Sequence, residues 1–439
     1  MKQQIELSTI DSLEAKRGGE RANRVLEHAL SNNPFWKVLK VSNTAENTNF
    51  TFSVNVPTMA CTNQRSSGRC WLFSALNVLR ESIAKKLNIK GNFELSQNFL
   101  SYYDKLEKYN YLMENVASRI SEKKDDRELY MLLKDGVSDG GQWIMFVNLV
   151  KKYGLMPKAC FSETYQSEET RHSNILCNSI LRQFAAALRK DPSKKDELKE
   201  YYFSRIYDVL TNSFGIPPKE FTFEYEDKDS NVHRLEKMTP LSFFKKYVGE
   251  EIDEYVSVIN APTQDKPYFK RYEVKMVGNV IEGEKTVHFN VPYKRFEEMI
   301  IAQLKDGDLV WFGSDVSYFR DVDCHLWDDT LFDYKSAFDI ELSFSKEEML
   351  DNYQAMMNHA MVLCGVDLVD EKPIRWKVEN SWGTVGPNNG YYIMSESFFE
   401  KFVFQAAIKK KYFTEEELKA LEEEPTLLPP WDPFGTLAD

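Results

Sequence analysis

A cysteine at the start of a long amphipathic segment is the feature that most constrains this chain. After Cys70, leucine and isoleucine recur at steps of three and four, at positions 72, 76, 79, 83 and 87. That period predicts a helix with Cys70 at or near its N-terminus, where the partial positive charge favours a thiolate. Gln64 lies six positions earlier on the preceding loop, where its side-chain amide could point at an oxyanion. The segment predicts a nucleophilic cysteine.

The size and charge of the chain indicate a globular protein with a large core. Its 439 residues are many for one compact domain, and 42% hydrophobic with 28% charged residues is ordinary for a soluble protein. The formal net charge is −12 and no basic stripe stands out, so nucleic-acid binding is not expected. The first residues form no apolar signal-peptide core, and no apolar run approaches membrane length. We expect a cytoplasmic protein that does not contact membranes.

Six cysteines are scattered along the chain, and none forms a Cys-x-x-Cys pair. This spacing favours free thiols in a reducing compartment over a disulfide framework or a zinc ribbon. The run Asp321-Val322-Asp323-Cys324-His325 offers four possible metal ligands, but their spacing matches no established metal site. A solvated loop is the favoured interpretation of this run. Neither a metal nor another cofactor is expected.

Hydrophobic periodicity divides the chain into an early helical part and a late strand-rich part. The predicted helices cover the N-terminal residues to about 31, the segment after Cys70, residues 141–153 and the charge-rich stretch 181–210. The predicted strands lie at 49–56, 271–291, 309–312, 361–366, 375–378 and 391–394. Helices early and strands late indicate an α+β fold with two halves, and a catalytic cleft would lie between them.

The C-terminal segment 414–439 combines a helix start, prolines and apolar residues. Thr414-Glu415-Glu416-Glu417 has the capping-box pattern that opens a short helix. Prolines at 425, 429, 430 and 433 then favour an extended path. The apolar residues on this path predict that it docks on the rest of the protein: Leu427, Leu428, Trp431, Phe434 and Leu437.

A late histidine and an asparagine 21 positions after it would complete the chemistry that Cys70 needs. A nucleophilic cysteine requires a base, and the base requires an orienting partner. His359 immediately precedes an apolar strand, and two adjacent strands would place the Asn380 carbonyl where it accepts the imidazole N–H. Trp382 could shield that hydrogen bond from water. Gln64 and the backbone N–H of Cys70 would form an oxyanion hole.

Taken in order, these motifs resemble the papain-like cysteine peptidases. The neighbourhood of Cys70 lacks the second cysteine that papain places before its nucleophile, and it resembles instead the bleomycin hydrolase and bacterial aminopeptidase C family. The resemblance implies a cysteine aminopeptidase that acts on peptides, with bleomycin-type amide hydrolysis as a side activity. It covers nearly the whole chain and rests on the segments 62–73, 139–141, 311–313, 378–383 and 431–438.

The resemblance implies a two-lobed papain-like core with a helical lobe, a β-barrel-like lobe, helical insertions and a C-terminal arm in the cleft. It also implies a ring-like homohexamer whose active sites face an inner channel. The implied divisions are an N-terminal arm or oligomerisation segment (1–60), a helical lobe with the nucleophile helix (61–164), a largely helical insertion (165–290), a β-rich lobe with His359 and Asn380 (291–413) and the C-terminal arm (414–439).

Substrate contacts are implied for two glycines and for the end of the chain. Gly140 and Gly141 resemble the pair along which papain-like enzymes hold extended substrate backbone. A terminal carboxylate on Ala438 or Asp439 would receive the free amino group of the substrate, which would explain aminopeptidase specificity. Relatives commonly end in Gly-Ala-Leu-Ala, whereas this chain continues to Asp439. We hypothesise that Cys70 removes Asp439.

Other interpretations stay open from the residues alone. A thiol endopeptidase on the same scaffold is expected if the tail does not close the cleft. A non-catalytic peptide-binding or chaperone ring belongs to a different class, and a basic channel lining would allow nucleic-acid binding despite the acidic balance. Cys70 could instead be a buried apolar residue, Asn380 a turn cap, and Gly140-Gly141 a plain turn.

Overall fold

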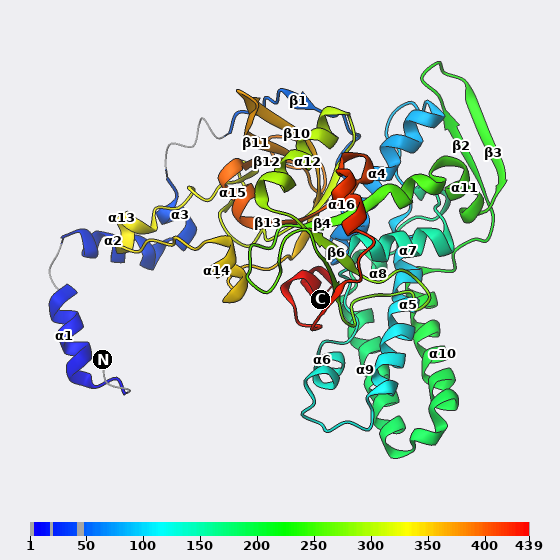
Figure 1. Ribbon diagram of the computed structural model, residues 1–439, viewed down its shortest axis with the longest axis horizontal. Coiled ribbons are helices and arrows are strands. Elements are labelled where there is room, and N and C mark those ends of the chain that lie inside the picture. Colours follow the sequence, from blue (N-terminus) through cyan, green and yellow to red (C-terminus); the bar gives the residue numbers. More distant parts are fainter. Residues whose placement is uncertain (1–3, 18–20, 42–47, 439) are drawn as a thin grey trace.

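The computed structural model describes residues 4–17, 21–41 and 48–438. Figure 1 shows a helix-rich half beside a sheet-rich half, with the N-terminal helices extending away from the sheet and the C-terminal segment lying between the two halves. The mixture of helices and sheet agrees with the α+β class predicted from the sequence. Segments far apart in the sequence therefore meet where the two halves touch.

The helix-rich half is built around α4 (Cys70–Leu87), which begins at Cys70 as predicted. The predicted amphipathic helix is buried almost all round: 14 of its 18 residues are buried, because the sheet covers one side and other helices cover the rest. It ends at Asn88, whose left-handed conformation closes the last turn. The other helices of this half are α5 (Gln97–Ser118), α6 (Arg127–Asp135), α7 (Trp143–Tyr153), α8 (Tyr165–Glu168), α9 (Arg171–Lys190), α10 (Lys195–Phe214) and α11 (Pro240–Tyr247).

Helices α5, α9 and α10 pack together around a second apolar core, which includes Tyr109, Leu181, Phe184 and Leu210. α7 and the pair α9 and α10 correspond to the helices predicted at 141–153 and 181–210. A hairpin of β2 (Phe221–Glu226) and β3 (Val232–Met238) forms a separate two-stranded sheet at the edge of this half (Figure 1).

Among the described residues, twelve strands form the sheet of the other half. In spatial order they are β14 (Thr426–Leu428), β5 (Arg271–Val274), β6 (Val287–Asn290), β4 (Tyr255–Ile259), β13 (Val403–Lys409), β7 (Val310–Ser314), β10 (His359–Val369), β11 (Lys372–Glu379), β12 (Tyr391–Ser395), β9 (Leu326–Trp327) and β8 (Arg320–Asp321), with β1 (Val54–Asn55) paired to β10. The strands predicted between 309 and 394 are confirmed as β7, β10, β11 and β12, which are neighbours and antiparallel.

Two predicted ranges differ from the structure. The strand expected at 49–56 is reduced to Val54–Asn55, although Phe50 and Phe52 are half-buried as the alternation indicated. Residues 165–290 are mostly helical up to residue 214 and again in α11, but β4, β5 and β6 from this range belong to the main sheet. A boundary at 290 would therefore cut the sheet, because long-range strand pairing joins these short strands to β13.

The remaining helices flank the sheet or end the chain: α12 (Tyr293–Lys305), α13 (Tyr334–Phe338), α14 (Lys346–Asp351), α15 (Glu396–Phe402), α16 (Glu415–Ala420) and the 3₁₀ helix η5 (Pro433–Ala438). The capping box that opens α16 is confirmed: Thr414 Oγ1 accepts the N–H of Glu417 at 3.2 Å, and the Glu417 carboxylate accepts the N–H of Thr414 at 2.8 Å. Between α16 and η5, strand β14 pairs with β5 and attaches the tail to the sheet.

The N-terminal helices are α1 (Leu7–Arg17), α2 (Arg21–Asn32) and α3 (Phe35–Leu39). α1 and α2 contain no buried residue among those described, and Figure 1 shows them apart from the rest of the chain. Across the described ranges, no helix has the length and apolar character needed to span a membrane.

Polar contacts as well as apolar packing attach α4 to the sheet. Ser74 Oγ donates to the carbonyl oxygen of Ala360 in β10 at 2.8 Å. Arg80 and Asn77 both reach the Glu379 carboxylate at the end of β11, at 2.9 and 2.8 Å. The helix that begins at Cys70 is thereby held in register with the two strand ends that carry His359 and Asn380.

Candidate active site

The structure places Cys70 at the first position of α4, directly against β10. Its Sγ accepts a hydrogen bond from the backbone N–H of Ala360 at 3.4 Å. The next residue is fixed from two sides: Trp71 Nε1 donates to the carbonyl oxygen of Asp139 at 2.7 Å, and the carbonyl oxygen of Trp71 accepts from Trp311 Nε1 at 3.1 Å. These contacts leave the start of the helix little freedom to move.

His359 is the first residue of β10, and Asn380 follows the end of the adjacent strand β11. His359 Nε2 lies 2.9 Å from Asn380 Oδ1. Because an amide oxygen only accepts, Nε2 carries the proton and Nδ1 is the unprotonated nitrogen of the neutral ring. Trp382 stacks on the imidazole with ring centroids 4.9 Å apart. The ring is therefore held in one tautomer and one orientation.

Gln64 lies on the loop before α4, and both ends of its amide have partners. Oε1 accepts from Ser381 Oγ at 2.6 Å, and Nε2 donates to the carbonyl oxygen of Ser67 at 2.6 Å. The backbone N–H of Gln64 also donates to the carbonyl oxygen of Ser381 at 2.9 Å. Since Nε2 has two N–H bonds, one is left to point into the cavity that Gln64 lines.

The loop that contains Asp139 and Gly140 rests on two buried lysines of α5. Lys105 forms an ion pair with the Asp139 carboxylate. Lys108 Nζ donates to the carbonyl oxygen of Gly140 and lies 2.8 Å from the Asp104 carboxylate. Although burial raises the pKa of Asp139, the charge and hydrogen bond of Lys105 outweigh it and hold that pKa well below its usual range. The charged side chains of Lys105 and Lys108 therefore anchor the loop to α5.

Gly141 is packed against the ring of Trp71 and bound to the tail. A Cβ at this position would lie 2.5 Å from the indole, so no larger residue fits without displacing Trp71. The N–H of Gly141 donates to the carbonyl oxygen of Leu437 at 2.8 Å, and Gly140 N–H donates to Ser138 Oγ at 3.0 Å. The backbone N–H groups of Gly140 and Gly141, at the two glycines predicted to contact substrate, are therefore hydrogen-bonded within the protein in this structure.

Several contacts anchor the tail on its way to the pocket. The Asp432 carboxylate lies 3.0 Å from Lys266 Nζ, with both side chains nearly buried. Arg127 lies over the ring of Trp431 at 3.6 Å from its centroid. Thr436 Oγ1 donates to the carbonyl oxygen of Met357 at 2.9 Å. Of the apolar tail residues expected to dock, Leu428, Phe434 and Leu437 are buried and Trp431 is half-buried, whereas Leu427 is exposed.

The end of the chain is described to Ala438, whose backbone belongs to η5. Asp439, the expected cleavage site and one candidate for the terminal carboxylate, lies outside the described residues. The tail contacts the glycine loop through the carbonyl oxygen of Leu437, a contact that the sequence did not predict.

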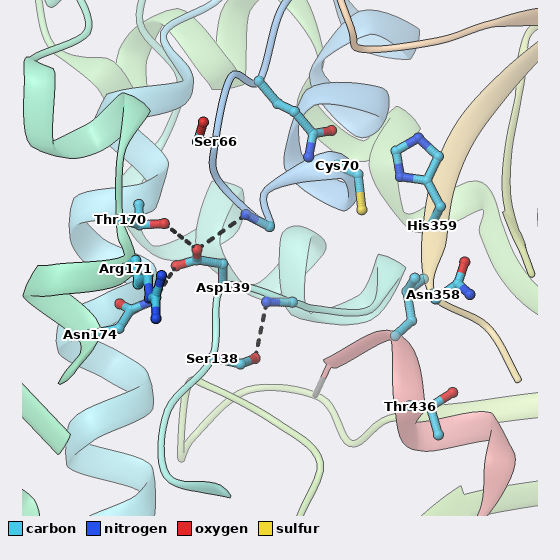
Figure 2. Close-up of a pocket in the computed structure, with 14 residues that line it drawn as sticks. Ser66, Cys70, Ser138, Asp139, Thr170, Arg171, Asn174, Asn358, His359 and Thr436 are labelled. Carbon is cyan, nitrogen blue, oxygen red and sulfur yellow. Dashed lines mark hydrogen bonds between the residues drawn. The ribbon is translucent and has the colours of Figure 1, made fainter. Parts of the chain in front are cut away.

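These residues surround a cavity of about 470 Å³. Figure 2 shows the Cys70 sulfur and the His359 ring facing it together, with Thr436 of the tail on the same side and Asp139 between Cys70 and α9. The volume lies within the range of roughly 300–1,000 Å³ found for ligand pockets. The cavity is lined by Gln64, Ser66, Gly68, Cys70, Ser138, Asp139, Gly140, Thr170, Arg171, Asn174, Asn358, His359, Thr436 and Leu437.

Burial shifts Cys70 and His359 away from their charged forms. It raises the pKa of Cys70 to about 11, against the hydrogen bonds from the backbone N–H groups of Ala360, Trp71 and Cys70 itself. It lowers the pKa of His359 to about 4, against the hydrogen bond to Asn380. The hydrogen bonds at the helix N-terminus lower the thiol pKa as predicted, but the loss of solvent around the sulfur is the larger effect and raises it.

The Asp321–His325 run is buried at its two ends and exposed at Val322 and Asp323 between them. Asp321 is buried and pairs with Lys40, and His325 is buried with its ring stacked on Tyr392 at 4.2 Å between centroids. Within the described ranges, no group of three or more histidine, cysteine or acidic side chains could hold a metal ion. The expectation of a solvated loop fails at Asp321, because Lys40, far away in sequence, supplies the counter-charge that permits burial of this carboxylate.

Three contacts of this site had no sequence signal of their own. Ser381, inside the Asn380–Gly383 motif, holds the amide of Gln64. Lys105 and Lys108 hold the glycine loop from α5. Their helical spacing resembles that of ordinary charged surface residues, and only the fold shows that they are buried. Arg171 also faces the cavity, and no sequence pattern marks it.

Comparisons with known proteins give a consistent result over the whole chain. A sequence model described as the Peptidase C1-like family matches residues 4–435. Aminopeptidase C of Lactobacillus delbrueckii subsp. lactis is 42% identical, with 100% of this chain and 99% of that protein aligned. Human bleomycin hydrolase is 38% identical over 86% of each chain. The crystal structure of PepW from Lactobacillus rhamnosis HN001 superposes with a TM-score of 0.95 at 40% identity, covering 99% of each chain.

Proposed function

The chain belongs to the Peptidase C1-like family, and from that premise we propose that it is a cysteine-type aminopeptidase that removes the first residue of peptides. One observation carries the proposal: the tail is hydrogen-bonded to Gly141 within the same cavity that Cys70 and His359 line. Relatives named aminopeptidase C and bleomycin hydrolase support both the peptide substrate and the hydrolysis of amide bonds.

The reaction uses Cys70 as the nucleophile and His359 as the base. Nδ1 of His359 accepts the thiol proton while the sulfur attacks the carbonyl carbon of the first residue. Burial opposes each charge by itself, but the transfer creates a thiolate and an imidazolium next to each other, and their attraction in a low-dielectric site offsets that penalty. The side-chain oxygen of Asn380 accepts a hydrogen bond from His359 Nε2 throughout and keeps the ring aligned.

The second N–H of Gln64 Nε2 and the backbone N–H of Cys70 stabilise the negative charge that develops on the substrate oxygen. His359 then gives its proton to the departing amine, the carbon–nitrogen bond breaks, and the acyl group remains as a thioester on Cys70. Water attacks the thioester with His359 as base. The free amino acid leaves, and the thiol regains its proton.

The tail explains the choice of aminopeptidase over endopeptidase activity. A substrate with more than one residue before the scissile bond would extend along the glycine loop, where the carbonyl oxygen of Leu437 already occupies Gly141 N–H. A peptide with a free N-terminus fits between the tail and Cys70, and the terminal carboxylate of the tail receives its amino group.

Deletion of residues 436–439 tests this proposal. Wild type hydrolyses aminoacyl-coumarin substrates with a free amino group and leaves N-acetylated peptides intact. The truncated protein cleaves the acetylated peptides, and a Cys70→Ala variant cleaves neither class. Equal cleavage of blocked and free substrates by wild type would instead establish a thiol endopeptidase. Absence of both activities in folded wild type would reject the peptidase assignment.

Three further properties belong to this proposal. The chain forms a homohexamer through its N-terminal arm, a role supported by the lack of any buried residue among the described residues of α1 and α2. It acts in the cytoplasm, which suits its six free thiols. Cys70 removes Asp439 from its own chain, so intact-mass measurement finds the residue in a Cys70→Ala variant and not in wild type.

A further inference from the structure

The cavity has a polar wall on the side away from the base and the tail. Thr170, Arg171 and Asn174 line it from the start of α9, and Ser66 and Gly68 line it from the loop before Cys70. Figure 2 shows Ser66 and the α9 residues on the opposite side of the pocket from His359 and Thr436. None of the mechanistic steps above uses this wall.

Asp139 also lines the cavity beside this wall, and both oxygens of its carboxylate already have partners. One oxygen of Asp139 pairs with Lys105 and accepts from Asn174 Nδ2 at 3.0 Å. The other accepts from Thr170 Oγ1 and from the backbone N–H of Gly68 at 3.1 Å. The carboxylate is neutralised by Lys105 and enclosed by donors, so it neither binds a substrate cation nor repels an anion strongly.

Arg171 is the charged residue of the wall whose side chain remains available to a ligand. Its side chain is exposed, and among the described residues no hydrogen bond, ion pair or ring contact engages its guanidinium. The neighbouring Arg65 lies 3.7 Å from the Glu168 carboxylate, so that cation already has a partner. Arg171 also begins a 20-residue helix whose N-terminal end adds a partial charge of the same sign. The uncompensated charge of this wall is positive.

The course of the reaction decides which part of a substrate meets this wall. The departing amine must lie toward His359, which protonates it, and the tail occupies Gly141. Once the carbonyl carbon is at Cys70, the side chain of the first residue is left with the space bounded by Ser66, Gly68 and the start of α9.

We propose that this polar wall is the binding site for the side chain of the substrate's first residue, and that Arg171 gives the enzyme a preference for acidic first residues, glutamate and aspartate. The inference rests on the proposed aminopeptidase function and adds a substrate class to it. An acidic side chain gains a charge-assisted hydrogen bond to the guanidinium. Its neutral amide analogue has the same shape without the charge.

The test compares kcat/KM for glutamyl-, glutaminyl-, alanyl- and lysyl-coumarin amides. Wild type is expected to prefer glutamyl over glutaminyl substrate by about two- to five-fold, the range of an exposed ion pair. Arg171→Gln brings the glutamyl-to-glutaminyl ratio to about one, and Arg171→Glu makes lysyl the better charged substrate. Lys190→Gln removes the same charge from the far end of α9, roughly 28 Å away along the helix, and keeps the wild-type ratio.

Salt gives a second readout that needs no variant. The Debye length falls from about 10 Å at 0.1 M to about 3 Å at 1 M ionic strength, so the glutamyl preference of wild type declines across this range. A wild-type ratio of one or below, or a preference that survives Arg171→Gln, overturns the inference while alanyl hydrolysis still supports the aminopeptidase. Failure of folded wild type on all four substrates rejects the proposed function itself.

Discussion

Replacing Arg80 by methionine tests how the two halves of the protein are held together beneath the pocket. Arg80 Nη2 lies 2.9 Å from Glu379 Oε1, and the two side chains are 1% and 0% exposed. The same nitrogen donates to the carbonyl oxygens of Met59 and Ala60 at 3.2 and 3.0 Å. Methionine keeps an unbranched side chain in this space but removes the charge. The Glu379 carboxylate is then left buried without a counter-charge.

Removing one partner of a buried ion pair costs about 3–5 kcal/mol of folding free energy. At ~2.1 cal/mol/K per residue, the unfolding entropy of the 439-residue chain is ~0.9 kcal/mol/K near the melting temperature. A chain that unfolds in one transition should therefore melt about 3–5 °C lower as the Arg80→Met variant when Glu379 is ionised.

The folding free energy lost in the Arg80→Met variant should depend on pH. Burial raises the pKa of Glu379 to about 7, while Arg80 acts in the opposite direction, so the pKa rises further in the variant. A carboxyl whose folded-state pKa lies above its unfolded value loses stability as pH increases through the folded pKa. Above pH 7 the variant therefore loses more than wild type. Below about pH 6 both folded forms hold the proton, and the difference shrinks to the lost hydrogen bonds, about 1–2 kcal/mol.

Thermal unfolding followed by the fluorescence of the eight tryptophans, at about pH 6 and about pH 9, measures both effects. Lys86→Met is the matched control on the same helix: its pair with Glu251 is 3.2 Å long, with the lysine side chain 44% exposed. An exposed pair contributes less than about 1 kcal/mol, so this variant should melt within about 1 °C of wild type at both values. An Arg80→Met shift of the same size at both pH values would refute the role assigned to the buried carboxylate charge.

Three further outcomes follow from contacts around the pocket. Gln64→Ala should lower kcat by about 10²–10³ with little change in KM, as the loss of one oxyanion donor does; a fall of less than ten-fold contradicts that role. Gly141→Ala forces a Cβ to within 2.5 Å of the Trp71 ring, so we expect about 1–3 kcal/mol of destabilisation in urea unfolding. An unchanged urea midpoint would show that Trp71 moves aside without cost. Lys266→Met leaves Asp432 unpaired in its nearly buried site and should loosen the tail, seen as new cleavage of N-acetylated peptides; continued exclusion of blocked peptides would show that other contacts suffice.

Local patterns in the sequence predicted the elements that carry the site. The spacing of leucines after Cys70 fixed where α4 begins, and the short apolar runs located β7, β10, β11 and β12. The capping box placed α16 to the residue. Each of these features is decided by neighbours within a few positions, so one sequence is sufficient to find them.

Features that depend on distant partners could not be read in the same way. Asp321 is buried because Lys40 pairs with it, and Lys108 is buried because it supports Gly140 and pairs with Asp104. The raised pKa of Cys70 has the same origin, since it reflects how completely the fold removes water from the sulfur. Such effects arise from packing between separate segments of the chain, or from a surface covered only in the finished fold.

The tail contact also sets an order of events during synthesis. Cys70 leaves the ribosome long before Leu437, whose carbonyl oxygen binds Gly141 beside it, because 367 residues separate the two in the chain. At about 5–20 residues per second, this interval lasts roughly 20–70 s. His359 itself leaves the ribosome 289 residues after Cys70. Every nascent chain thus carries its thiol for many seconds without the base, and the tail closes the pocket later still.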